Sequence, residues 1–214
     1  MAVAWQDLLP GATVYGLNLQ QGLNWAQKRL QSMAMAKQVL AWLDLEMTGL
    51  NPDHCVIVQL ALILTDENLN ELVPPLELNV WQPESVLERM SPFVRAMHEK
   101  SGLLPLVRRS EVSLEEAEQE CLRLLTPHAP YRTARLCGNS IGQDRRFLVS
   151  QMPIFEGYLH YRQVDVSSIK ELARWWQGVK FSKAEGGQHT ALCDIRQSIA
   201  ELKYYRSEVF LPRA

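Results

Sequence analysis

Residues 39–50 read Val-Leu-Ala-Trp-Leu-Asp-Leu-Glu-Met-Thr-Gly-Leu, an apolar run followed by two acids one residue apart. The run predicts a strand. Because residues i and i+2 of a strand project from one face, Asp44 and Glu46 should point into the same small volume. Two carboxylates held together repel unless a cation neutralises them, and hard oxygen ligands suit Mg²⁺ or Mn²⁺. Gly49 fits a tight turn that ends the strand and admits a substrate to the backbone. Taken alone, the pattern also fits a strand that ends in two solvated acids.

Two further segments supply acids. Asp144 follows residues 137–143, Cys-Gly-Asn-Ser-Ile-Gly-Gln, in a loop that leads into a helix, and Asp194 lies five positions after His189. Four carboxylates and a histidine are what a two-metal phosphodiester hydrolase needs. Two divalent ions roughly 3.5–4 Å apart would hold the attacking and leaving oxygens of an in-line displacement. A histidine with an ordinary pKa of about 6.5 can take the proton from the attacking water.

These segments resemble the oligoribonuclease family, small-RNA 3′-to-5′ exonucleases of the group called DEDDh after its four acids and one histidine. In chain order, the resemblance rests on residues 44–50, 137–147, 160–167, 170–174 and 189–195. Many exonucleases share the Asp-x-Glu…Asp…His-x4-Asp skeleton. Three other features are much more specific to the oligoribonuclease family: the Met-Thr-Gly-Leu ending, the Gly-Asn-Ser-Ile-Gly-Gln-Asp loop and the His-Tyr-Arg segment. The likeness covers roughly residues 38–210, which we expect to form the exonuclease domain.

Three opening strands followed by alternating helices and strands favour an α/β protein with a mixed central sheet flanked by helices. The resemblance implies that this is the ribonuclease H-like exonuclease fold. It implies hydrolysis of very short oligoribonucleotides, especially dinucleotides, from the 3′ end to nucleoside 5′-monophosphates. Asp44, Glu46, Asp144 and Asp194 would bind two Mg²⁺ or Mn²⁺ ions, with Asp44 as the bridging ligand. His189 would act as the general base. The alternative that His189 is a satisfied structural histidine is disfavoured by its spacing to Asp194 and by the complete acid set.

Two apolar residues are implied to contact the bases. Leu50 matches a leucine that wedges between the last two bases, and Phe93 stands where the family usually has tryptophan. Either ring can stack on a base, an interaction worth about 1–3 kcal/mol. Without the resemblance, Leu50 is alternatively a loop residue tucked into the core, and Phe93 an aromatic of a helix core.

Polar residues are implied to close the other end of the substrate. Ser140, Ser167 and His98 match positions that cap the 5′ phosphate of a dinucleotide, and a third nucleotide would collide with such a cap. Without the resemblance, Ser167 is more simply a helix N-cap and His98 a surface residue. Tyr161 and Arg162 resemble residues delivered across a dimer interface, so we expect a homodimer with two shared sites.

Three departures from the family pattern accompany this likeness. Gln59 replaces a frequent glutamate, Cys193 replaces an acid before Asp194, and Phe93 replaces tryptophan. Neither Gln59 nor Cys193 is one of the five catalytic positions. The change at Phe93 and the amino-terminal extension bear on substrate preference more than on chemistry. Two alternatives stay open: a broader DEDDh exonuclease that trims RNA or DNA 3′ ends, and a non-catalytic module that binds dinucleotides or a protein partner.

Composition restricts the partners. A net charge of −2 over 214 residues gives no general basic face, which disfavours the binding of long duplexes. A short single-stranded RNA presents few phosphates, so a local cluster of donors would suffice to bind it. The four cysteines lack CxxC spacing and read as reduced thiols. We expect a cytoplasmic protein, with a mitochondrial location as the alternative. No apolar run is long enough to predict a membrane helix.

Periodicity predicts the elements of the domain. Strands are expected over 39–43, 56–64, 76–80, 134–138 and 161–165, and helices over 83–100, 113–125, 168–176 and 189–206. Ser113 and Glu116 have the spacing of a capping box. Residues 1–37 form an extension of unknown role with a possible helix over 24–37, and residues 211–214 form a tail.

Overall fold

A computed structural model gives the fold and describes residues 38–182 and 190–210. The extension 1–37, the tail 211–214 and His189 lie outside the described residues. In the part of the chain that is described, no helix is long and apolar enough to cross a membrane.

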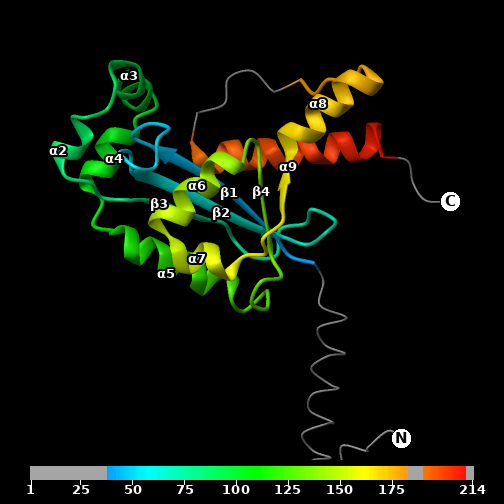
Figure 1. Cartoon of the computed structure of the whole chain (residues 1–214), viewed down its shortest axis with the longest axis horizontal. Helices are drawn as coiled ribbons and strands as arrows, with labels where there is room; N and C mark the ends of the chain where they lie inside the picture. The colour runs from blue at the N-terminus through cyan, green and yellow to red at the C-terminus, as the bar shows by residue number, and fades with distance from the viewer. Residues whose placement is uncertain (1–37, 183–189, 211–214) are drawn as a thin grey trace, which may run out of the picture. The chain divides into compact units, whose positions relative to one another are not determined.

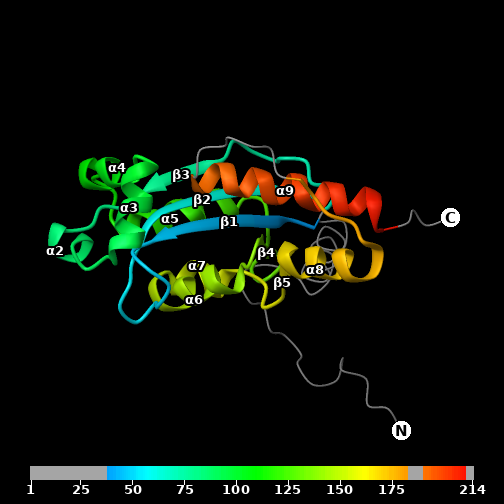
Figure 2. The same cartoon turned by 90° about the horizontal axis from the view of Figure 1, so that it is seen from above.

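A mixed five-stranded sheet forms the centre of the domain, in the order β3-β2-β1-β4-β5 (Figure 2). The two pairings on one side of β1 are antiparallel, and those of β1 with β4 and of β4 with β5 are parallel. The strands are β1 (Leu40–Met47), β2 (Ile57–Thr65), β3 (Leu76–Asn79), β4 (Arg135–Gly138) and β5 (Gln163–Asp165). Each corresponds to a predicted strand, and the predicted fold class is confirmed.

Helices cover both faces of this sheet. In Figure 1, α9 lies above the sheet and α5 and α7 lie below it. The lower layer comprises α5 (Leu114–Leu125), α6 (Gly142–Gln151) and α7 (Pro153–Tyr158), and the upper layer α8 (Val166–Gln177) and α9 (Ala191–Glu208). Three short helices, α2 (Glu84–Leu87), α3 (Pro92–Lys100) and α4 (Leu103–Arg109), pack with Val58 at one end of the domain.

The alternation of side chains along β1 decides where its acids point. Ala41, Leu43 and Leu45 belong to the core under α5–α7, whereas Leu40 and Trp42 belong to the core under α8 and α9. Burying each of the larger side chains stabilises the fold by about 1.5–3 kcal/mol. The even-numbered series continues to Asp44 and Glu46, which therefore lie on the α9 face of the sheet.

The prediction of one continuous helix over 83–100 is wrong, because the helix is interrupted in its middle. Residues 88–91 separate α2 from α3, because the Ser91 side chain accepts a hydrogen bond from Val94 N and Pro92 starts the second helix. Helices α4 and α7 were not predicted. The capping box of α5 is present, with both reciprocal bonds between Ser113 and Glu116.

Candidate metal centre and substrate site

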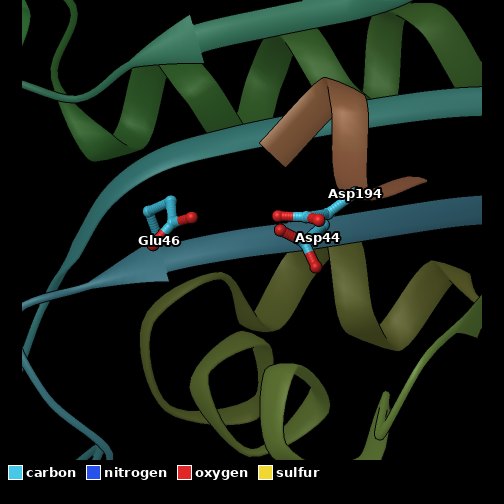
Figure 3. A group of neighbouring side chains, drawn as sticks. All are labelled: Asp44, Glu46 and Asp194. Carbon is cyan, nitrogen blue, oxygen red and sulfur yellow. The ribbon is translucent and has the colours of Figure 1, made fainter. Parts of the chain in front are cut away.

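Three carboxylates meet on the α9 face of the sheet. Asp44 and Glu46 come from β1 and Asp194 from the first turn of α9, and one ligand oxygen from each lies within 4.8 Å of the others (Figure 3). The start of α9 is fixed locally, since the Thr190 side chain accepts a hydrogen bond from Cys193 N. The three atoms on offer are all carboxylate oxygens, the donors that Mg²⁺ and Mn²⁺ prefer, so the residues present fit a divalent-metal site.

Asp144, on α6, is hydrogen-bonded to the backbone of β1. Among the described residues, β4 pairs with β1 only as far as Trp42. Beyond that point Leu45 N donates to Asp144 Oδ1 at 3.0 Å, and Asp144 is buried. The structure therefore brings together Asp44, Glu46 and Asp194, and it anchors Asp144 from α6 to the strand between the first two.

Crowding changes the acidity of these groups. Burial, together with the charges of Asp194 and Asp144, raises the pKa of Glu46 to about 7. Burial also raises the pKa of Asp144 to about 7 with a contribution from Asp165, against the lowering effect of the Leu45 N–H. Without a cation, the site thus holds protons near neutral pH. A divalent cation would replace them by neutralising the same oxygens.

His98 lies directly beside Glu46. Its side chain is 1% exposed, Nε2 is 2.9 Å from the Met47 carbonyl oxygen, and Nδ1 is 3.8 Å from Glu46 Oε2. The alternative that His98 is a surface residue is wrong. Its partner is a backbone carbonyl 51 positions away in sequence, so no local pattern indicated the burial.

The two serines predicted to cap a phosphate are neighbours. Ser140 N donates to both Asp165 Oδ1 and Ser167 Oγ at 3.0 Å, and the two hydroxyl oxygens lie 3.2 Å apart. Ser140 has a φ of 52°, a left-handed conformation that is uncommon without glycine. Asp165, not Ser167, is the N-cap of α8, and its Oδ1 also accepts from Ser167 N. Asp165 was not predicted as a cap, although Asp is among the preferred residues at a helix N-cap.

The implied base-contacting residues are exposed. Leu50 is 73% exposed and Phe93 79% exposed, so the alternatives that placed them in the core are wrong. The turn that carries Leu50 is held by Gln143, whose Nε2 donates to the Leu50 carbonyl. A Cβ at Gly49 would lie 2.7 Å from Cys55 Sγ, so any other residue there would force the Cys55 side chain to move.

Tyr161 and Arg162 lie in the exposed segment before β5. The Tyr161 ring is 71% exposed and stacks on the His160 ring with their centroids 4.5 Å apart. The Arg162 guanidinium lies 5.4 Å from the centroid of Tyr161. The segment is tied to α6 by Arg145, which donates to the carbonyls of residues 160 and 161. Tyr161 and Arg162 thus form an exposed pair in which the guanidinium packs near the aromatic ring.

Gln59 keeps a structural role at the site despite its departure from the family pattern. It stands opposite Glu46 across the β1–β2 pair. Its Oε1 accepts from Ala191 N, the first residue of α9, at 3.2 Å, and its Nε2 donates to Asn79 Oδ1 at 2.8 Å. Gln59 thereby connects the sheet to the helix end that carries Asp194.

A comparison with known proteins identifies the class of protein to which this chain belongs. The fold and the acidic cluster are accompanied by a match of residues 41–202 to the RNase_T model, described as an exonuclease. Among solved structures, the zinc-bound Escherichia coli Exonuclease I in complex with single-stranded DNA superposes with a TM-score of 0.62 at 14% identity, over 81% of this chain and 41% of that one. Exonuclease I from Methylocaldum szegediense gives 0.61 at 19% identity, over 80% and 41%. This chain spans about two fifths of those proteins and shares their fold.

Curated relatives narrow the class. The oligoribonuclease of Pseudomonas paraeruginosa is 51% identical over 170 residues, covering 79% of this chain and 94% of its own. That of Vibrio cholerae is 49% identical over 181 residues, covering 83% and 99%. The chain belongs to the oligoribonuclease family of 3′-to-5′ exoribonucleases.

Proposed function

We propose that this chain hydrolyses very short single-stranded RNA, above all dinucleotides, and releases nucleoside 5′-monophosphates. The observation that carries the proposal is the convergence of Asp44, Glu46 and Asp194 within 4.8 Å in a chain of this family. The relatives named oligoribonuclease support the substrate class.

The acidic residues are proposed to hold two Mg²⁺ or Mn²⁺ ions, with Asp44 shared between them and Asp144 completing the set. When bound, such ions would polarise the phosphate and neutralise the charge that develops on the leaving 3′ oxygen. His189, outside the described residues, is proposed to accept the proton of the attacking water. The bond from Leu45 N fixes one Asp144 oxygen and orients the other.

The protein is proposed to select the length of its RNA substrate by contacting both the 3′ and the 5′ end. The exposed side chains of Leu50 and Phe93 are available to wedge and stack against the bases at the 3′ end. The Ser140 and Ser167 hydroxyls would receive the 5′ phosphate. His98, which is buried between the Met47 carbonyl and Glu46, would join them only by exchanging those contacts for the phosphate. Two hydroxyls give short-range recognition of a single phosphate and no continuous basic groove.

A homodimer is proposed to complete each site, with Tyr161 and Arg162 reaching the substrate of the partner protomer. Their exposure and mutual packing support this role. The test mixes two inactive variants, Asp44→Asn and Arg162→Ala, after subunit exchange. If Arg162 acts across the interface, about a quarter of the sites regain both groups and activity returns in proportion. A monomeric mass in solution with full activity would contradict the proposal.

The compartment is proposed to be the cytoplasm. Cys55, Cys121, Cys137 and Cys193 are all free thiols. Free thiols are typical of proteins in a reducing environment.

The deciding experiment measures hydrolysis of a 5′-labelled RNA dinucleotide and a labelled 20-mer, each with Mg²⁺ and with EDTA. Fast metal-dependent cleavage of the dinucleotide with little cleavage of the 20-mer is the expected result. Comparable trimming of both would favour the broader exonuclease. Binding of the dinucleotide without hydrolysis would favour a non-catalytic module. Asp44→Asn controls for contaminating nuclease.

A further inference from the structure

A network of partly and fully buried polar side chains adjoins the proposed phosphate cap. Asn139 is its centre: its Oδ1 accepts from Ser167 Oγ at 3.1 Å, and its Nδ2 donates to Ser198 Oγ at 2.8 Å and to Glu201 Oε2 at 3.1 Å. One amide side chain thus joins three segments of the chain, namely the β4–α6 loop, the start of α8 and the middle of α9.

Glu201 is the buried end of this network, with a side chain only 1% exposed. Besides Asn139, its carboxylate accepts from the Tyr205 hydroxyl at 3.1 Å and pairs with Lys170 Nζ on α8 at 3.3 Å. A buried carboxylate is costly unless it is fully partnered, so this set of contacts holds Glu201 in a single position. The acidic cluster described above does not include it.

Each joined segment carries a group of the proposed site. The β4–α6 loop carries Ser140 in its left-handed conformation and leads to Asp144. The start of α8 carries Ser167. On α9, Ser198 Oγ donates to the Asp194 carbonyl at 2.9 Å, one turn before it. The network therefore runs from the serine pair to the helix that presents a carboxylate of the acidic cluster.

We infer that Asn139 and Glu201 are positioning residues that set the spacing between the Ser140–Ser167 pair and the acidic cluster, and so determine the length of the RNA that is cleaved. The inference rests on the proposed function, since it presumes that the serines receive the 5′ phosphate. A cap selects for length only if it stands at a fixed distance from the reacting phosphodiester. Displacements of about 0.5–1 Å are enough to lose a productive geometry.

The test compares Asn139→Ala and Glu201→Gln with the wild type on 5′-phosphorylated di-, tri- and pentanucleotides. Glutamine keeps the size of Glu201 but turns one acceptor oxygen into a donor facing other donors. We expect the ratio of kcat/KM for the dinucleotide to that for the pentanucleotide to fall at least about tenfold, chiefly through a higher dinucleotide KM. The Mg²⁺ concentration for half-maximal activity should stay within about twofold, because no ligand of the proposed metal site is removed.

Glu118→Gln is the matched control. Glu118 is also a buried glutamate, but it lies on α5 in the opposite layer, where Oε1 accepts from Ile154 N and Phe155 N. This variant should lower the melting temperature comparably and leave the length ratio unchanged. If Glu118→Gln moves the ratio as much as Glu201→Gln does, the effect is general destabilisation and the inference is wrong.

A double-variant cycle gives an independent readout. Because Ser167 Oγ donates to Asn139, Ser167→Ala and Asn139→Ala should change dinucleotide kcat/KM less than additively when combined. Additive effects, or an equal loss at all three lengths, would overturn the inference. If Asn139→Ala does not fold, the length ratio of Glu201→Gln decides alone. A wild-type ratio near one would instead refute the proposed dinucleotide preference itself.

Discussion

Glu46 is the residue whose ionisation couples the site to folding. Its folded pKa of about 7 exceeds the ordinary value of 4.5, so between these pH values the folded state binds more protons than the unfolded state. The free energy of unfolding of the metal-free protein should therefore be highest below pH 4.5 as far as Glu46 is concerned, and fall as pH rises through 7. The pKa difference corresponds to at most about 3 kcal/mol of unfolding free energy, and the partial exposure of Glu46 reduces this contribution.

Urea denaturation in EDTA at pH 5 and pH 8 measures this effect. The stability of the wild type relative to Glu46→Gln, which cannot titrate, should decrease between the two pH values. Added Mg²⁺ should stabilise the wild type more at pH 8 than at pH 5, because protons compete with the cation at the lower pH. A pH-independent difference between the two proteins would contradict the raised pKa.

Asp44→Asn separates function from stability. The substitution removes one of three converging carboxylates, so we expect turnover to fall more than about a hundredfold and the Mg²⁺ requirement to rise at least about tenfold. The melting temperature in EDTA should stay equal or rise, because repulsion with Glu46 and Asp194 is relieved. Asp53→Asn, an exposed acid in the turn after β1, is the control and should leave all three quantities unchanged.

Single residues also show how far sequence reasoning extends. The spacing of Asp44 and Glu46 predicted their common face because strand periodicity is local. The burial of His98 and the bond of Asp144 to Leu45 N depend on contacts 51 and 99 positions apart. No pattern within one segment contains such contacts, so the sequence could nominate these residues without giving their geometry.

At the scale of elements, α9 depends on β2 for its starting point. Gln59 Oε1 accepts from Ala191 N, and Gln59 Nε2 is bonded to Asn79 on β3. Gln59→Leu should lower the free energy of unfolding by about 1–3 kcal/mol, since buried polar groups lose their partners. Turnover should also fall, because the helix end that carries Asp194 loses its attachment to the sheet. Urea denaturation and steady-state kinetics test both effects.

The milder variant Gln59→Glu sharpens this prediction. It retains an acceptor for Ala191 N but loses the donor to Asn79 and adds a negative charge opposite Glu46. Turnover should therefore exceed that of Gln59→Leu at saturating Mg²⁺ and show a steeper metal dependence. Equal kinetics for both variants and the wild type would mean that α9 holds its position without Gln59.

Elements were predictable where their signals are local. The capping box of α5 and the Ser-Pro start of α3 lie within their own segments, although the second was absorbed into one longer predicted helix. Helix α7 is different: its first amides donate to Glu118 of α5, 36 and 37 positions away. Helix α4 begins after Gly102, with φ 77°, and carries Pro105 in its first turn, residues that read as breakers within a sequence.

For the whole molecule, the small net charge predicts a weak salt dependence. A dinucleotide with a 5′ phosphate presents about two phosphates, and the expected slope of log affinity against log salt for single strands is about −0.7 per phosphate contact. Raising NaCl from 50 to 200 mM at constant Mg²⁺ should therefore increase the dinucleotide KM less than about tenfold. A much larger increase would indicate an extended basic groove and favour the broader exonuclease.

The mixed sheet and its two helical layers followed from the alternation of predicted strands and helices, since few arrangements bury such a pattern. The pairing of β1 with both an antiparallel and a parallel neighbour did not follow from periodicity, because a strand buried on both faces carries no mark of its neighbours' direction. The neighbours of β1 were therefore not predicted and are given by the structure.

The bond between Asp144 and Leu45 N bears on the choice of an inactive protein for crystallising a bound substrate. Asp144 supplies the acceptor for a β1 amide that lies beyond the β4 pairing, so its removal leaves a buried backbone donor without a partner. Asp144→Ala should therefore lower the free energy of unfolding by about 1–3 kcal/mol, whereas Asp44→Asn leaves this bond in place. A trap for the enzyme–substrate complex is better built at Asp44, and Asp144→Asn, which keeps an acceptor oxygen, is the second choice.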